Sequence, residues 1–199
     1  ELKPGFASQS EGPRPGDLMF KDLEQDGIIN DQDRTIIGKQ IPDFMYSLNL
    51  SANWRNFNFS CFFQGVEGVD AYIGGYLVSP FYNSAPLLDT WLTDRWTFEN
   101  PSEQFQRVYV DKTKQKIVSD YYITDASYLR LKNIELGYEF DTRLISKLRL
   151  QKLKVSASVQ NAFLWSNTKS FDPEKLGDVV SSDFHPQARV YSIGVNVIF

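Results

Sequence analysis

Hydrophobic and polar residues alternate along five separate stretches of the chain. In the first stretch, residues 44–54, the even-numbered positions are all apolar or aromatic, and Ser or Asn fills most of the positions between them. Side chains of an extended strand point alternately to its two faces, so this pattern predicts a strand with one apolar face and one polar face. The pattern returns in residues 57–64, 133–140, 153–165 and 189–199. The chain is therefore expected to be all-β.

The connections between these predicted strands have very unequal lengths. Arg55-Asn56 joins the first two strands tightly, which predicts a β-hairpin over residues 44–64. Residues 1–43 and 65–126 are far longer than the usual connections of a compact domain. Outer-membrane barrels alternate short periplasmic turns with long extracellular loops. We therefore expect 1–43 and 65–126 to be extracellular loop regions, and 127–199 to hold the final three barrel strands with a periplasmic turn and a further extracellular loop.

The last predicted strand ends on an aromatic residue. Its apolar face carries Tyr191, Ile193, Val195, Val197 and Phe199. Chain ends of soluble domains usually fray in solvent, whereas membrane barrels combine alternating strands with aromatic girdles. We expect this strand to close a barrel by pairing with a first strand outside the sequence.

A soluble antiparallel sandwich is the alternative, because its strands also alternate. Such a fold usually turns every 8–12 residues or so, which the long connections fit poorly. Five strands are too few to close a barrel, since even small bacterial barrels have about eight, so the chain is expected to be part of a larger assembly. Residues 128–132 break the alternation by placing Arg130 and Lys132 in the apolar phase, and we expect them to continue the third strand above the membrane.

Composition narrows the classes of function. The chain has 25 acidic and 21 basic residues and no Lys/Arg cluster, so a nucleic-acid partner is not expected. No stretch approaches the ~20 consecutive apolar residues of a membrane helix. The single cysteine, Cys61, excludes an internal disulfide and a cysteine-based metal cluster. Because Cys61 lies in the apolar phase, we expect it to contact lipid or neighbouring side chains rather than carry out redox chemistry.

An acidic segment in the first long connection follows the ligand spacing of a calcium loop. Its oxygen donors would be Asp22, Glu24, Asp26, the Ile28 carbonyl, Asn30 and Asp33. Gly27 permits the sharp turn, while Glu24 and Asp33 depart from the residue types usual at their positions. The spacing predicts a structural Ca²⁺ site. The alternative is a solvated acidic turn, because Asp, Asn and Gly favour turns without any metal.

The connection 65–126 is rich in aromatic residues, which could stack on sugar rings or hold peptide side chains. These residues are Tyr72, Tyr76, Phe81, Tyr82, Trp91, Trp96, Phe98, Phe105 and Tyr109. For any single ring, packing against neighbouring loops or a partner is the favoured interpretation. The only histidine, His185, has no accompanying nucleophile motif, and Glu135 and Glu139 share the polar face of one strand. No enzyme is predicted.

Several segments match one family in the same order. They are residues 15–22, the acidic loop 22–33, 34–38, 42–44, 62–65, 94–97 with 99–101, 127–133, 136–138, 158–163 and 172–174. Together they resemble the C-terminal region of the SusC/RagA-like TonB-dependent outer-membrane transporters. Each segment is weak evidence alone, and their shared order makes the resemblance specific.

The resemblance implies the last five or so antiparallel strands of a roughly 22-stranded transmembrane β-barrel that an N-terminal plug fills. It also implies the outer membrane of Bacteroidetes, a SusD-like surface lipoprotein as partner, and import of glycans or peptides with energy from TonB. The plug and the TonB-contacting segment would belong to the remainder of the protein. The alternative is an envelope docking module built on the same barrel, for which transport is secondary.

Overall fold

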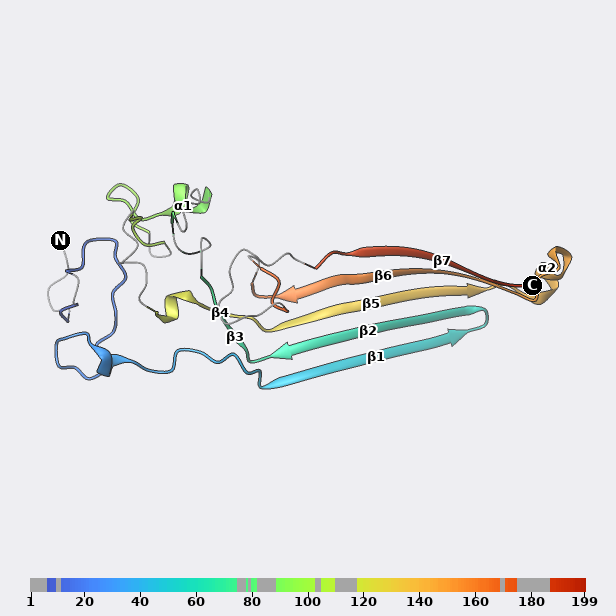
Figure 1. Ribbon diagram of the computed structural model, residues 1–199, viewed down its shortest axis with the longest axis horizontal. Helices are drawn as coiled ribbons and strands as arrows, with labels where there is room; N and C mark the ends of the chain where they lie inside the picture. The colour runs from blue at the N-terminus through green and yellow to red at the C-terminus, as the bar shows by residue number, and fades with distance from the viewer. Residues whose placement is uncertain are drawn as a thin grey trace. The chain divides into compact units, whose positions relative to one another are not determined.

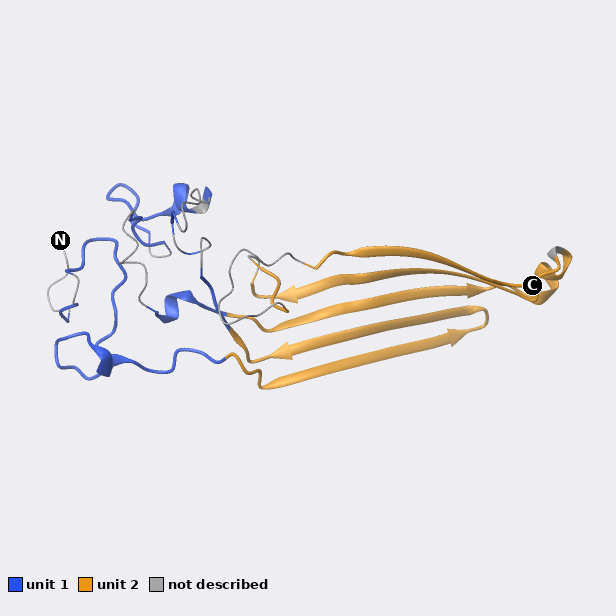
Figure 2. Cartoon of the chain, viewed as in Figure 1, with its two compact units in different colours: residues 1–39, 71–124, 177–183 blue, residues 40–70, 125–176, 184–199 orange. Residues whose placement is uncertain are grey.

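The computed structural model describes residues 7–9, 12–74, 78, 80–81, 89–102, 105–109, 118–168, 171–174 and 187–199. The chain divides into two compact units, coloured separately in Figure 2. The loop unit comprises residues 1–39, 71–124 and 177–183. The sheet unit comprises residues 40–70, 125–176 and 184–199.

The sheet unit is built on five antiparallel strands in the order β1-β2-β5-β6-β7, as Figure 1 shows. The strands are β1 (Phe44–Trp54), β2 (Phe57–Glu67), β5 (Tyr128–Glu139), β6 (Lys152–Ser166) and β7 (Val190–Ile198). The expected all-β class is confirmed, with one strand for each alternating stretch. The hairpin runs further than predicted, because β2 continues to Glu67 instead of ending at residue 64.

The pairing register carries the apolar positions of all five strands onto one face of the sheet. One row of paired residues across this face is Trp54, Phe57, Tyr138, Val155 and Val195. A second row is Ala52, Phe59, Leu136, Ala157 and Ile193. The row between them on the opposite face is Asn53, Asn58, Gly137, Ser156, Gly194. Because side chains alternate along each strand, matched registers produce a wholly apolar face and a mainly polar face.

The apolar face is most closely packed where β2, β5 and β6 meet. Cys61, Leu131 and Ala162 are buried there, and Phe63, Ile134 and Val159 pack against them. Cys61 is a free thiol among apolar neighbours, which agrees with its expected role as a packing residue.

A β-bulge interrupts the sheet beside this cluster. Phe62 and Phe63 are adjacent in β2, but their partners Asn133 and Leu131 in β5 are separated by Lys132. The extra residue lets the alternation change phase, so Arg130 pairs with Gln64 of the polar face. The strand does continue upstream as expected, but the placement of Arg130 on the apolar side was wrong.

Short turns join the strands at one end of the sheet. β1 and β2 meet at Arg55, whose φ of 53° is left-handed. Between β5 and β6 lie α2 (Thr142–Ile145) and the 3-10 turn η6 (Ser146–Leu148). Asp141 begins α2 by accepting a hydrogen bond from the Arg143 N–H at 3.0 Å, and the left-handed Arg149 ends the turn.

The remaining elements are short. They are η1 (Asp31–Asp33), β3 (Asp70–Tyr72), α1 (Asp89–Asp94), η5 (Asp120–Tyr122) and β4 (Ile123–Asp125), with β3 and β4 paired in a two-stranded sheet. The connection between β2 and β5, expected over 65–126, is residues 68–127 and has small elements of its own. Among the described residues, no helix is long and apolar enough to cross a membrane.

Candidate cation-binding and ligand-binding sites

The acidic loop, residues 22–33, is held together by its own carboxylates. Asp22 accepts hydrogen bonds from the N–H groups of Gln25 at 2.6 Å and Gly27 at 2.8 Å. Asp26 accepts one from the Ile28 N–H at 2.8 Å. Gly27 has a φ of 83°, as the predicted sharp turn requires.

Asp33 closes the acidic loop by joining its two ends. Its carboxylate accepts hydrogen bonds from the N–H groups of Leu23 at 2.8 Å, Glu24 at 3.3 Å and Asn30 at 2.9 Å. Asn30 caps η1 by accepting from the Gln32 N–H at 2.7 Å. The N–H groups of Asn30 and then Leu23 lower the pKa of Asp33, because they stabilise its charged form.

The hydrogen bonds of the acidic loop do not test calcium binding directly. Within the described part of the chain, no three acidic, histidine or cysteine side chains come together as a metal-binding group. A carboxylate has about four acceptor positions, so a backbone hydrogen bond leaves room for a cation. The donor types of the loop suit calcium, and its binding stays a prediction.

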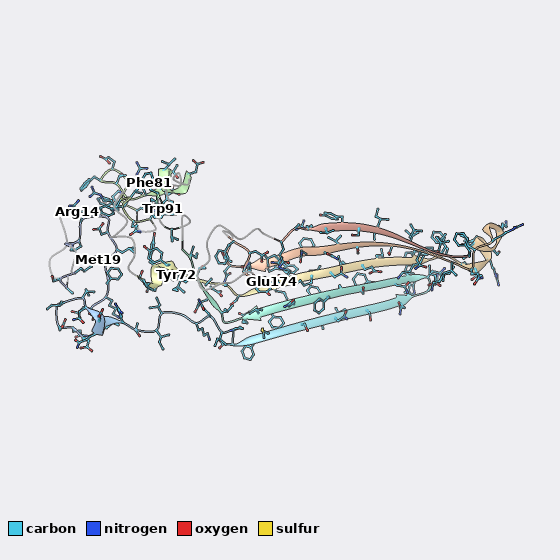
Figure 3. All side chains as sticks on the ribbon, in the orientation of Figure 1. Arg14, Met19, Tyr72, Phe81, Trp91 and Glu174 are labelled. Carbon is cyan, nitrogen blue, oxygen red and sulfur yellow. The ribbon has the colours of Figure 1, made fainter. Side chains whose placement is uncertain are left out.

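Most described aromatic rings of the loop unit pack against other groups. Trp91 is 1% exposed and meets Phe105 edge-on with ring centroids 5.2 Å apart. Trp96 covers Gly16, which has a φ of 89° and where a Cβ atom would overlap the ring. Figure 3 shows where Trp91 lies within this unit. Packing, the favoured interpretation of these rings, therefore describes Trp91 and Trp96 well.

Tyr109 ties the N-terminal segment to the same cluster. Its hydroxyl donates a hydrogen bond to the Asp17 carboxylate. The Arg107 N–H donates to the Gly16 carbonyl at 2.7 Å, beside this contact. Burial and, next, the Asp17 hydrogen bond raise the pKa of Tyr109 to about 12.

Phe98 differs from the other rings because it is 71% exposed. Its ring meets Trp96 edge-on at 5.0 Å. A hollow of about 210 Å³ lies beside these two rings, lined by Arg95, Trp96, Thr97, Phe98, Glu99, Arg107 and Val108. An exposed ring beside charged groups can stack on a sugar or an aromatic side chain while they form hydrogen bonds. Tyr76, Tyr82 and His185 lie outside the described residues.

A buried ion-pair cluster in the sheet unit joins two of the motif segments. The Arg130 guanidinium contacts the Asp172 carboxylate, and their side chains are only 3% and 4% exposed. Arg130 Nε lies 3.2 Å from a Glu174 carboxylate oxygen, and Lys132 contacts the other oxygen. Figure 3 shows Glu174 at the end of the sheet where β5 begins. Sequence reasoning noted both segments but did not predict that they bind each other.

Further contacts hold the connection between β6 and β7 to this cluster. The Asp172 carboxylate also accepts hydrogen bonds from the N–H groups of Glu174 and Gln187, each at 3.1 Å. Pro173 is fully buried between the two acids. We call Arg130, Lys132, Asp172, Glu174 and Gln187 the charged clasp.

The two glutamates on the polar face each pair with lysine rather than with each other. Glu139 lies 3.2 Å from Lys152, and Glu135 lies 3.6 Å from Lys154. All four side chains are between 31% and 44% exposed. Exposed ion pairs of this kind are typical of a surface in contact with water.

Similarity to known proteins extends along nearly the whole chain. No family profile matches it. The chain is 28% identical to the TonB-dependent receptor P3 of Formosa agariphila, over 98% of this chain and 20% of that protein. It is also 28% identical to the TonB-dependent receptor SusC of Bacteroides thetaiotaomicron, over 99% of this chain and 20% of that protein. The solved structure of the RagAB peptide importer in its open-open state matches with a TM-score of 0.66 and 22% identity, over 82% of this chain and 18% of that one. The chain thus spans about a fifth of the length of these relatives.

Proposed function

Because the chain is homologous to TonB-dependent receptors such as SusC, as its motifs predicted, we propose that it forms part of an energised outer-membrane importer. In this proposal the five strands are a segment of the barrel wall in the bacterial outer membrane. The loop unit belongs to the extracellular surface. The relatives are receptors rather than enzymes, which agrees with the absence of a predicted catalytic site.

The two-faced sheet is the observation that supports a membrane wall most directly. Several side chains of the apolar face are exposed, including Leu48 at 51%, Leu136 at 50% and Ile193 at 83%. A soluble sandwich would bury such a face against a second sheet, whereas lipid can cover it in a barrel. β1 and β7 lie at the two edges of the described sheet, so a barrel would continue from both.

The proposed cargo is a glycan or a peptide, captured with a SusD-like surface lipoprotein and moved with energy from TonB. Support for the cargo class comes from the relatives, one of which is described as a peptide importer. The hollow beside Trp96 and Phe98 supplies a suitable surface, since its rings can stack and its Arg and Glu side chains can form hydrogen bonds.

Uptake by the intact receptor tests the proposal. Cells that carry the full-length gene should accumulate glycan or peptide cargo only while TonB is present. Phe98→Ala should weaken cargo binding by about tenfold, the equivalent of about 1.4 kcal/mol. Leu92→Ala is the matched control, because Leu92 is a 51% exposed side chain of α1 outside the hollow lining.

Two results would reject the importer. One is recovery of the intact protein in the soluble fraction without detergent. The other is unchanged cargo uptake after deletion of the receptor, together with loss of envelope partners from the membrane. That second result would favour the docking module.

A further inference from the structure

The short-turn end of the sheet carries an unbalanced group of basic side chains. Between β5 and β6, the turn of residues 141–151 holds three basic residues, Arg143, Lys147 and Arg149, and one acidic residue, Asp141. Arg55 adds a further cation in the neighbouring β1–β2 turn. Figure 1 shows α2 beyond the strand ends at this side of the sheet. A local excess of positive charge contrasts with the formal net charge of −4 for the chain.

Aromatic rings of the apolar face lie next to this basic group. Phe57 and Tyr138 have ring centroids 4.8 Å apart, and Tyr138 and Phe140 are 5.0 Å apart. Trp54 lies 6.4 Å from Phe57, and the Arg55 guanidinium lies 5.1 Å from the Trp54 ring centre. Aromatic rings are concentrated where a barrel crosses the boundary between lipid tails and headgroups. The basic turn therefore lies at the level where headgroups would begin.

The turn is arranged so that its charges face outward. Ile145 is 3% exposed and anchors α2, whereas Leu144 is 66% exposed. Arg143, Lys147 and Arg149 are exposed as well. Exposed cations beside an exposed leucine form a surface with both polar and apolar parts.

These cations also lack the counter-charges that several other basic residues of the sheet unit have. Lys152 and Lys154 pair with Glu139 and Glu135. Within the described residues, none of the three basic side chains of the turn forms an ion pair. Its single acid, Asp141, uses its carboxylate to cap α2.

We propose that Arg143, Lys147 and Arg149 bind the phosphate headgroups of anionic phospholipids in the periplasmic leaflet. The inference rests on the proposed membrane function, because only an inserted barrel brings this turn to the headgroups. Lipid suits the site better than free phosphate because Leu144 and the aromatic rings offer a surface for acyl chains. Basic residues at a membrane surface each strengthen anionic lipid binding by roughly fivefold.

Native mass spectrometry of the intact receptor tests this inference. The receptor is reconstituted into vesicles of phosphatidylcholine and phosphatidylglycerol in equal parts, and the lipids retained after release are counted. We expect retained phosphatidylglycerol to exceed phosphatidylcholine, and the triple variant R143Q/K147Q/R149Q to lose that preference. The double variant K21Q/R34Q is the control, since both residues belong to the loop unit and not to the turn, and it should keep the preference.

The outcomes separate the two proposals. A wild-type receptor that inserts and retains both lipids equally would overturn the inference and leave the importer intact, as would complete displacement of the lipid by inorganic phosphate. Failure of the wild-type receptor to insert would overturn both. If the triple variant does not assemble, the single variant R149Q and the composition dependence of wild-type retention decide the matter.

Discussion

Replacing Arg130 by methionine should release the connection between β6 and β7 from the sheet. The guanidinium of Arg130 is the main counter-charge of the buried Asp172 carboxylate, and both side chains are less than a tenth exposed. Removing one partner of a buried ion pair costs about 3–5 kcal/mol, because the other charge stays buried. Asp172 would keep the N–H groups of Glu174 and Gln187. We therefore expect a loss near the lower limit, about 3 kcal/mol.

Amide hydrogen exchange of the intact receptor in detergent measures this loss locally. The Glu174 and Gln187 amides donate to Asp172, so they exchange when the charged clasp opens. A loss of about 3 kcal/mol corresponds to roughly a hundredfold faster exchange.

Lys154→Met provides the matched control on the same face. The Lys154–Glu135 pair is 3.6 Å long, with side chains 31% and 37% exposed, so its removal should cost less than about 1 kcal/mol. The reasoning is refuted if Arg130→Met changes exchange of the two clasp amides by no more than this control does.

Four further predictions concern the loop unit. Gly16→Val should disrupt the packing of the Trp96 ring and cost about 1–3 kcal/mol of loop-unit stability. Gly12→Val, also at positive φ but in open space, should show backbone strain alone. Exchange of the Arg107 amide, which donates to the Gly16 carbonyl, distinguishes the two variants. The pKa of Tyr109, raised to about 12, predicts that loop-unit stability falls as pH rises from 10 to 12. Tyr109→Phe should reduce that dependence in a pH titration followed by fluorescence, and the remainder comes from Tyr72, Tyr121 and Tyr122, whose pKa values burial also raises. The lowered pKa of Asp33 predicts the opposite sign, with acidic-loop protection lost as pH falls below 3.8, and Asp33→Asn should lose it already at neutral pH. We also propose that calcium binds the acidic loop; added calcium should raise amide protection there relative to a chelator, and equal protection in both would reject the site.

The strands could be predicted from the sequence because alternation follows directly from the pleat of a strand. Each alternating stretch became one strand, and its apolar residues reached the expected face. The bulge at Lys132 could not be predicted from one strand, since it is defined by the count of residues in the partner. Arg130 and Lys132 had disturbed the pattern, and that disturbance was the signal of the bulge.

The candidate sites were predictable only in part. Residue spacing identified the acidic loop, whose bonds lie within its own short segment. The charged clasp was missed because its partners, such as Arg130 and Asp172, lie 42 residues apart and nothing local links them. Among the aromatic residues, the sequence does not distinguish buried Trp91 from exposed Phe98, since burial depends on the surrounding loops.

The extra residue in β5 changes whether the odd-numbered or the even-numbered residues of that strand lie on the apolar face. Before Lys132 in the sequence, Leu129 and Leu131 lie on the apolar face, and after it Ile134 and Leu136 do. Deletion of that one residue would leave the faces of all others unchanged, whereas deletion of any residue within the regular part would turn one half of the strand inside out.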